Sequence, residues 1–169
     1  LRRGEVGPLI EILVQHPYPL CVLLDDAYSG LFYEEEVYRH SLFGELSRRA
    51  DPGKMLVCKA DGATKELVFF GGRIGFLTFS ATGAAATALE EKAAALIRAT
   101  ISSVCASTQM AVWGALASPT LGEEVEKVRL ILEGRYHALK KALDREGLLY
   151  YPFNSGCFAL LPVKGDCDQ

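Results

Sequence analysis

Apolar residues spaced three or four positions apart predict several helices along the chain. The longest begins at Thr120-x-x-Glu123, a capping-box sequence, and ends at Gly147, a residue type favoured just after helix C-termini. Its apolar stripe predicts one buried face and comprises Val125, Val128, Leu132, Tyr136, Leu139 and Leu143. Further helices are predicted over residues 4–15, 83–99 and 108–117, with a short helix from a Ser41 cap to Arg49.

Short apolar runs predict the strands. Residues 20–24 are apolar throughout and follow a helix, which is typical of a parallel strand buried between helices. Two more strands are predicted over residues 55–59 and 74–79, and residues 148–151 and 157–163 indicate a hairpin. This order predicts an α/β fold: a mostly parallel sheet with helices in residues 1–118, then a long helix and the start of a small α+β domain in residues 119–169.

The composition is that of a folded protein, because 50% of the 169 residues are apolar. Acidic and basic residues are interspersed and the net charge is -3, so no basic stripe points to nucleic acid as a partner. We expect neither membrane insertion nor export, because charges interrupt every apolar stretch and no signal peptide opens the chain. The first residue is Leu1, which suggests a piece of a longer protein.

The cysteines and histidines indicate no metal site. The five cysteines are odd in number and contain no C-x-x-C pair, which argues against zinc or a disulfide framework and favours a cytoplasmic location. They are Cys21, Cys58, Cys105, Cys157 and Cys167. The three histidines lack metal-ligand spacing, so no metal is expected.

Chemically capable side chains follow the predicted strands. Asp25 and Tyr28 come directly after the first strand, Lys65 follows the second, and Arg73 stands in a glycine-rich turn before the third. Strand ends of this kind meet at the edge of an α/β sheet where ligands bind. A lysine there can form an imine with a carbonyl cofactor, and an arginine can grip the cofactor's phosphate. The bland alternative is a solvated lysine beside a turn that only serves backbone geometry.

The combination Asp25-x-Ala27-Tyr28, then Lys65, then Arg73 eight positions later within G-x-R-x-G, resembles a known family. It is similar to the fold-type-I pyridoxal-phosphate enzymes, specifically the class I aminotransferases related to aspartate aminotransferase. The resemblance covers about residues 4–163. It implies that residues 1–118 are part of the three-layer large domain and that residues 119–169 hold the interdomain helix and the start of the small C-terminal domain.

The resemblance also implies roles for these residues with pyridoxal 5′-phosphate as the cofactor. Lys65 would form the imine with the cofactor and later carry a proton. Asp25 would pair with the pyridine nitrogen, and Tyr28 would donate its hydroxyl to the ring oxygen and lower the pKa of the imine. Arg73 would hold the phosphate. The neighbouring Asp26 is expected to be a loop or capping carboxylate.

Two further positions are compared with the family. Relatives often carry serine three residues and one residue before the lysine, where this chain has Gly62 and Thr64, so Thr64 or a backbone N–H would have to replace one phosphate contact. Arg98 resembles an arginine that reaches the neighbouring subunit's site in aminotransferases using dicarboxylates, which implies substrate binding across a homodimer interface. The alternative is an arginine that complements its own helix C-terminus. Lys59 lies at the wrong distance from Arg73 to replace Lys65.

The resemblance implies that this chain is the central-to-C-terminal part of an aminotransferase that exchanges the amino group of an amino acid, possibly dicarboxylic or aromatic, with a 2-oxo acid. The family's stacking ring and its arginine for the substrate α-carboxylate fall outside the chain, so we expect the chain alone to be inactive. Two alternatives stay open. One is another reaction on the same scaffold, such as C–S lysis, decarboxylation or aminomutation. The other is a non-catalytic ligand-binding domain.

Overall fold

The computed structural model describes residues 1–163 and shows a mixed α/β fold around a three-stranded sheet. The strand β1 (Leu20–Asp25) pairs in parallel with the central strand β2 (Met55–Gly62). The third strand, β3 (Gly75–Phe79), pairs antiparallel with the other edge of β2. The expected parallel pairing therefore holds for β1 and β2, while the segment between β2 and β3 reverses the chain.

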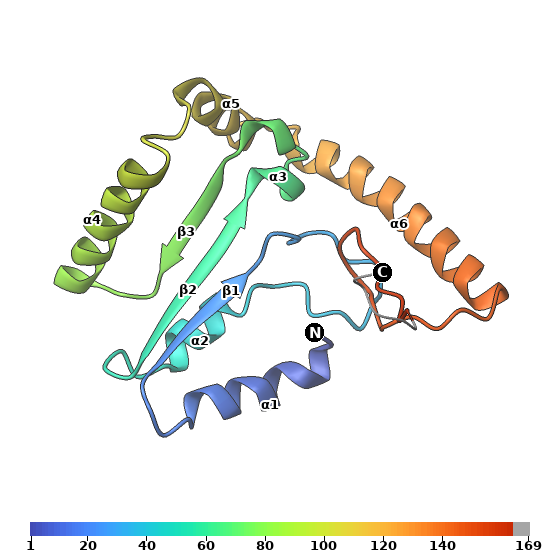
Figure 1. The fold of residues 1–169 in the computed structure, drawn as a ribbon, viewed down its shortest axis with the longest axis horizontal. Coiled ribbons are helices and arrows are strands. Elements are labelled where there is room, and N and C mark those ends of the chain that lie inside the picture. Colours follow the sequence, from blue (N-terminus) through green and yellow to red (C-terminus); the bar gives the residue numbers. More distant parts are fainter. Residues whose placement is uncertain (164–169) are drawn as a thin grey trace.

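The predicted helices are present with ends that shift by at most a few residues. Figure 1 shows the strands side by side, with α4 running alongside β3 and α6 on the opposite side of the molecule. A very short helix, α3, and a 3-10 turn, η1, lie between β2 and β3. The helical elements are α1 (Arg3–Val14), α2 (Phe43–Arg49), α3 (Ala63–Glu66), η1 (Phe70–Gly72), α4 (Gly83–Thr100), α5 (Ala106–Leu116) and α6 (Leu121–Arg145).

The largest core lies between α1, α2 and one face of the sheet. Leu46 from α2 and Val57 from β2 are fully buried there, and the amide of Phe43 donates to the Ser41 hydroxyl at 3.0 Å as the first turn of α2 forms. The buried members of this core are Val6, Ile10, Leu42, Leu46, Met55 and Val57. The apolar stripe of α1 and the apolar residues of the strands therefore pack together and hold α1 against the sheet.

The expectation that residues 20–24 are buried on both faces is wrong. Exposure alternates along β1: Val22 and Leu24 pack against the core, whereas the side chain of Leu23 is 65% exposed. The reason is that α1 and α2 cover one face of the sheet and, within residues 1–163, no helix buries the other face of β1. An apolar run therefore does not reveal by itself which of its faces a neighbour covers.

Of the predictions for the two ends of α6, the one for the C-terminal end is confirmed and the one for the N-terminal end is wrong. Gly147 adopts φ +63°, and the amide of Leu148 donates to the Leu143 carbonyl at 3.0 Å, so the predicted glycine C-cap is confirmed as a Schellman motif. The predicted capping box is wrong. Thr120 has a helical backbone, and its hydroxyl donates to the Glu124 carboxylate at 2.8 Å instead of accepting a backbone N–H.

The predicted hairpin over residues 148–163 is also wrong, because neither segment forms a strand. One backbone hydrogen bond joins them, from the amide of Tyr151 to the Leu160 carbonyl at 2.9 Å. Leu149 and Leu160 are 79% and 67% exposed, so their apolar character does not reflect burial against a sheet. Residues 164–169, including Cys167, lie outside the described part of the chain, and the domain boundary near residue 118 stays a prediction.

Candidate functional site

A pocket of about 270 Å³ lies at the sheet edge where β1 and β2 end. Asp25 is the last residue of β1 and stands opposite Ala60, and its carboxylate accepts the Ala27 amide at 3.1 Å. Thr64 from α3 and Arg73 from the turn before β3 line the same pocket. The structure therefore brings together three of the predicted site residues, at the edge where parallel strands commonly bind ligands.

Lys65 and Tyr28 lie beside each other next to this pocket. The Lys65 amine is 5.7 Å from the centre of the Tyr28 ring. Neither residue lines the pocket of Asp25, Thr64 and Arg73, but Asp25 and Tyr28 share a neighbouring hollow of about 460 Å³. Asp25 thus borders both spaces. Within residues 1–163 the contact described for the Lys65 amine is the one with the Tyr28 ring.

The other candidate lysine has a different environment. Lys59 forms an ion pair with Asp61 on the same strand, and both side chains are largely buried. The hydrogen bond and charge of Asp61 raise the pKa of Lys59, which keeps its amine protonated. An amine held in an ion pair is a poor nucleophile, so the pairing with Asp61 argues against Lys59 as the imine-forming residue.

The turn that carries Arg73 has an unusual backbone. Arg73 adopts φ +51° and ψ +45°, a left-handed conformation that costs a non-glycine residue about 1 kcal/mol or more. A side chain at the preceding Gly72 would meet the Phe69 ring at 2.3 Å. The guanidinium donates to the Phe70 carbonyl at 3.5 Å, a weak contact that leaves most of its donors available. Strain of this kind is found at sites that bind ligands.

The presence of glycine rather than serine at position 62 has a steric explanation. A Cβ at this position would lie 2.9 Å from the Ile74 carbonyl oxygen and 3.3 Å from Gly75 Cα, because Gly62 and Gly75 face each other across the ladder. A serine there would force β2 and β3 apart. Thr64 lines the pocket two residues later and supplies a hydroxyl that Gly62 cannot.

Three carboxylates and Lys59 surround the base of this site. Burial raises the pKa of Glu66 to about 7, and the negative charges of Asp61 and Asp26 add to the effect while Lys59 opposes it. One carboxylate oxygen of Glu66 and one of Asp26 are buried without a hydrogen-bond partner in the described structure. Asp26 does not line the pocket of Asp25, Thr64 and Arg73. The role of Asp25 as the carboxylate that meets the cofactor stays a prediction.

Arg98 lies apart from these residues. It is exposed in the last turn of α4, a helix without buried residues, and does not line the pocket. Figure 1 shows α4 alongside β3, on the side of β3 that faces away from β2. The role implied for Arg98 across a subunit interface stays a prediction.

Sequence reasoning missed the residues that pack on Tyr28. The ring of Phe158 meets the Tyr28 ring edge-on, with centroids 6.1 Å apart, and Gly156 lies against the other part of the ring. More than a hundred positions separate them from Tyr28 in the sequence. The one local signal was the glycine closing the turn from Pro152 to Gly156.

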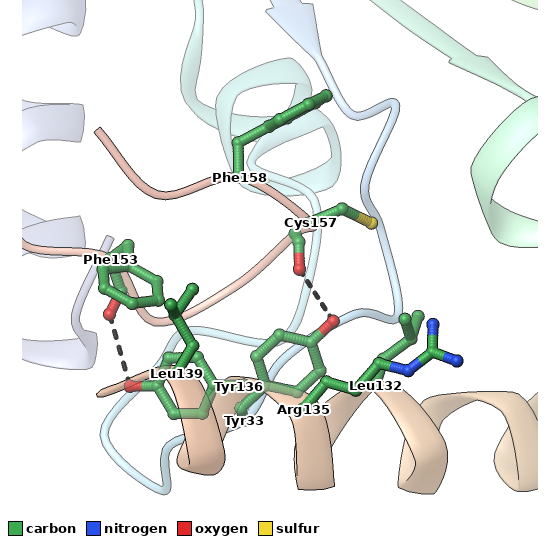
Figure 2. Close-up of a pocket in the computed structure, with 9 residues that line it drawn as sticks. Tyr33, Leu132, Arg135, Tyr136, Leu139, Phe153, Cys157 and Phe158 are labelled. Carbon is green, nitrogen blue, oxygen red and sulfur yellow. Dashed lines mark hydrogen bonds between the residues drawn. The ribbon is translucent and has the colours of Figure 1, made fainter. Parts of the chain in front are cut away.

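The same segment borders a second, aromatic pocket of about 220 Å³ against α6. The Tyr33 hydroxyl donates to the Gly156 carbonyl at 2.8 Å, and the Tyr136 hydroxyl lies 3.3 Å from the Phe153 carbonyl, contacts drawn as dashed lines in Figure 2. The Tyr136 hydroxyl donates its proton to the closer Glu34 carboxylate, which also accepts from the Lys140 amine at 2.6 Å. These contacts fasten α6 to the loop that follows Tyr28.

Other kinds of site find no support in residues 1–163. No helix of this part is long and apolar enough to cross a bilayer. No group of three or more histidine, cysteine or acidic side chains is arranged there to hold a metal ion.

Comparisons with known proteins agree on one fold. An aromatic aminotransferase from Pyrococcus horikoshii OT3 superposes with a TM-score of 0.72 at 20% identity, over 92% of this chain and 38% of that one. An aspartate aminotransferase from Thermotoga maritima gives 0.69 at 20% identity, over 98% and 39%. Protein A1 from Pyrococcus gives 0.73 at 20% identity, over 92% and 37%. This chain therefore spans less than two fifths of the length of these structures.

At such identity the superpositions show the fold alone. Comparison with curated protein sequences gave no match. The sequence profile of aminotransferase class I and II, however, matches residues 3–167, nearly the whole chain. The chain belongs to the class I and II aminotransferase family.

Proposed function

We propose that this chain carries the lysine-bearing part of the active site of an aminotransferase that exchanges amino groups between an amino acid and a 2-oxo acid. Members of the family use pyridoxal phosphate. The observation that supports the proposal is the shared pocket of Asp25, Thr64 and Arg73, with the Lys65 amine and Tyr28 directly beside it.

The residues fit the chemistry of this cofactor. Arg73 and Thr64 supply a cation and a hydroxyl donor suited to a phosphate. Asp25 supplies a carboxylate that can accept a proton from a ring nitrogen. The amine of Lys65 is suited to bonding an aldehyde carbon. Asp25 borders both hollows, so a flat ring beside it could reach both the phosphate-binding pair and the lysine.

Each residue has a distinct role in this proposal. Bound pyridoxal phosphate supplies an electron-accepting ring that makes the substrate Cα–H bond acidic. Lys65 would bond the cofactor and would move the substrate Cα proton. Asp25 would keep the ring nitrogen protonated, Tyr28 would donate its hydroxyl to the ring oxygen, and Arg73 with Thr64 would hold the phosphate.

The proposal extends to the class of substrate and to the assembly of the protein. Two of the similar structures are an aromatic and an aspartate aminotransferase, which suggests an aromatic or dicarboxylic amino acid as the substrate. We further propose a homodimer in which Arg98 reaches the partner's site and pairs with a substrate carboxylate. We place the protein in the cytoplasm, and the thiols of Cys21, Cys58, Cys105 and Cys157 are free, as a reducing compartment requires.

Borohydride trapping tests the central assignment. The full-length protein is loaded with pyridoxal phosphate, reduced and digested, and mass spectrometry locates the pyridoxyl group. We expect the group on Lys65, and we expect Lys65→Ala to lose both the label and the visible absorbance of the bound cofactor. Lys54→Ala, which removes an exposed lysine before β2, is the matched control and should keep both. A label that persists at another lysine in Lys65→Ala would refute the assignment.

The reaction type is tested separately. Amino acids are supplied together with 2-oxoglutarate, and amino exchange is measured beside β-elimination and carbon dioxide release. Amino exchange as the dominant process supports transamination. Dominant elimination or decarboxylation with an intact Lys65 label would keep the cofactor site and reject the reaction.

A further inference from the structure

Two residues from a distant part of the chain contact the Tyr28 ring. A Cβ at Gly156 would lie 3.4 Å from Tyr28 Cδ1 and 3.6 Å from Cγ, so the glycine backbone packs directly on the ring. Phe158 meets the same ring edge-on, with an interplanar angle of 81° and centroids 6.1 Å apart. Edge-to-face pairs of this kind have a preferred geometry, so they restrict how the tyrosine can rotate.

Hydrogen bonds fix this segment onto the loop of Tyr28. The amide of Gly156 donates to the Leu31 carbonyl at 3.0 Å, and the amide of Tyr33 donates to the Asn154 carbonyl at 3.2 Å. The Tyr33 hydroxyl completes the attachment through the Gly156 carbonyl at 2.8 Å, as Figure 2 shows. A glycine is favoured at position 156 because the backbone adopts φ +74°, a conformation that other residues rarely take.

Core packing does not explain the position of Phe158. Its side chain is 67% exposed, and it belongs to none of the buried clusters of residues 1–163. Its aromatic neighbour in this part of the chain is Tyr28, whose ring lies 5.7 Å from the Lys65 amine. The contact therefore joins an exposed side chain to Tyr28, which itself packs against the buried cluster of Leu31, Tyr33 and Tyr136.

We propose that Phe158 is a positioning residue that sets the orientation of the Tyr28 ring beside Lys65, together with the contact that the Gly156 backbone makes with the same ring. This inference rests on the proposed function, in which the Tyr28 hydroxyl donates to the cofactor's ring oxygen. A hydrogen bond to an anion depends on the donor's direction, so a ring that can tilt stabilises the oxyanion less. A weaker bond raises the pH at which the lysine-bound cofactor loses its proton.

The test is a spectroscopic pH titration of the full-length protein loaded with pyridoxal phosphate. In Phe158→Leu we expect the midpoint of the visible absorbance change to move up by about half a unit to one unit, in the same direction as in Tyr28→Phe. In the Tyr28→Phe background, which keeps the ring but lacks the hydroxyl, Phe158→Leu should cause no further shift. This double-mutant cycle separates positioning of the hydroxyl from a general effect on the fold.

Leu160→Ala is the control, because Leu160 is equally exposed, at 67%, and lies two residues from Phe158. It should leave the midpoint unchanged. An unshifted midpoint in Phe158→Leu, or an equal shift with and without the Tyr28 hydroxyl, would overturn the inference. Absence of the visible band in the unmutated protein would instead overturn the proposed function, and the inference with it. A thermal unfolding midpoint close to that of the unmutated protein shows that Phe158→Leu folds.

Discussion

Glu66 follows the proposed cofactor-binding lysine directly, and its carboxyl is withdrawn from water near two other carboxylates. Burial is the largest cause of its raised pKa, followed by the charge of Asp61, and the value reaches about 7. Because the folded state holds this proton more tightly than the unfolded chain, the free energy of unfolding falls as the pH rises from about 4.5 to about 7. The stability that the protonated Glu66 carboxyl contributes is therefore complete below about pH 4.5 and is lost as the pH rises to about 7.

The substitution Glu66→Gln should remove this dependence. We expect the free energy of unfolding of the variant to exceed that of the unmutated protein by about 1–3 kcal/mol at pH 8, with little difference near pH 4.5 where both side chains are neutral. Urea unfolding at several pH values measures it. Glu90→Gln, in an exposed position of α4, is the control and should leave the pH dependence in place. An unchanged pH dependence in Glu66→Gln would show that Glu66 ionises normally.

Two glycines, one inside α6 and one just after its C-terminal end, have opposite conformational requirements. Gly147 adopts φ +63° just after the helix, whereas Gly134 lies inside it, and a Cβ added at Gly134 would meet nothing within 4 Å. We expect Gly147→Ala to lower the free energy of unfolding by about 1 kcal/mol and Gly134→Ala to raise it by about 0.5–1 kcal/mol. The two variants make the same chemical change and serve as controls for each other. Shifts of the same sign would contradict the helix end described above.

The sequence was sufficient for elements whose own residues carry the signal. The helices and the three strands around the site were predictable because periodicity and caps such as Gly147 are local. The strands expected over residues 148–163 were not formed, since their apolar residues are largely exposed and one backbone hydrogen bond is all that joins the segments. The capping box predicted at Thr120 does not form, because the Thr120 backbone already has the helical conformation.

The roles of the candidate site residues stay predictions, but their placement can be compared with the structure. The sequence places Asp25, Lys65 and Arg73 near strand ends, and in the structure Asp25 and Arg73 line one pocket with Lys65 beside it. The place of Phe158 was not predictable, because its contact with Tyr28 depends on how the last part of the chain folds back over the loop after β1. The steric reason for Gly62 was also invisible, since it arises from the pairing of β2 with β3.

At the scale of the molecule, burial within residues 1–163 is divided among three small cores. Considerable apolar surface stays exposed in residues 1–163, and part of it is contiguous over β3 and α5. There Phe76, Trp113 and Leu116 line a shared hollow of about 270 Å³, and the side chains of Met110 and Trp113 are 67% and 70% exposed. Contiguous apolar surface of this kind favours association.

We therefore expect this chain to self-associate in a concentration-dependent way, as sedimentation velocity would show. A double substitution, Met110→Gln with Trp113→Gln, should shift the distribution towards monomer because it places polar groups in the contiguous surface. Leu130→Gln with Ile131→Gln alters two apolar residues of α6, 51% and 57% exposed, outside that surface, and should have little effect. A monodisperse monomer at all concentrations would refute the expectation.

The direct junction of β2 and α3 has a mechanical consequence. Gly62 ends the strand and Ala63 begins the helix, with no connecting residue, and Ala63 is fully buried. The backbone just before Lys65 is thus held by the strand and by the burial of Ala63, so the Cα of Lys65 cannot shift far towards a moving reactant. Any travel of the amine must come from rotation about the four side-chain bonds of Lys65, which limits it to an arc around a fixed Cα. A reacting carbon outside that arc would have to be brought to the lysine, since the lysine cannot be carried to it.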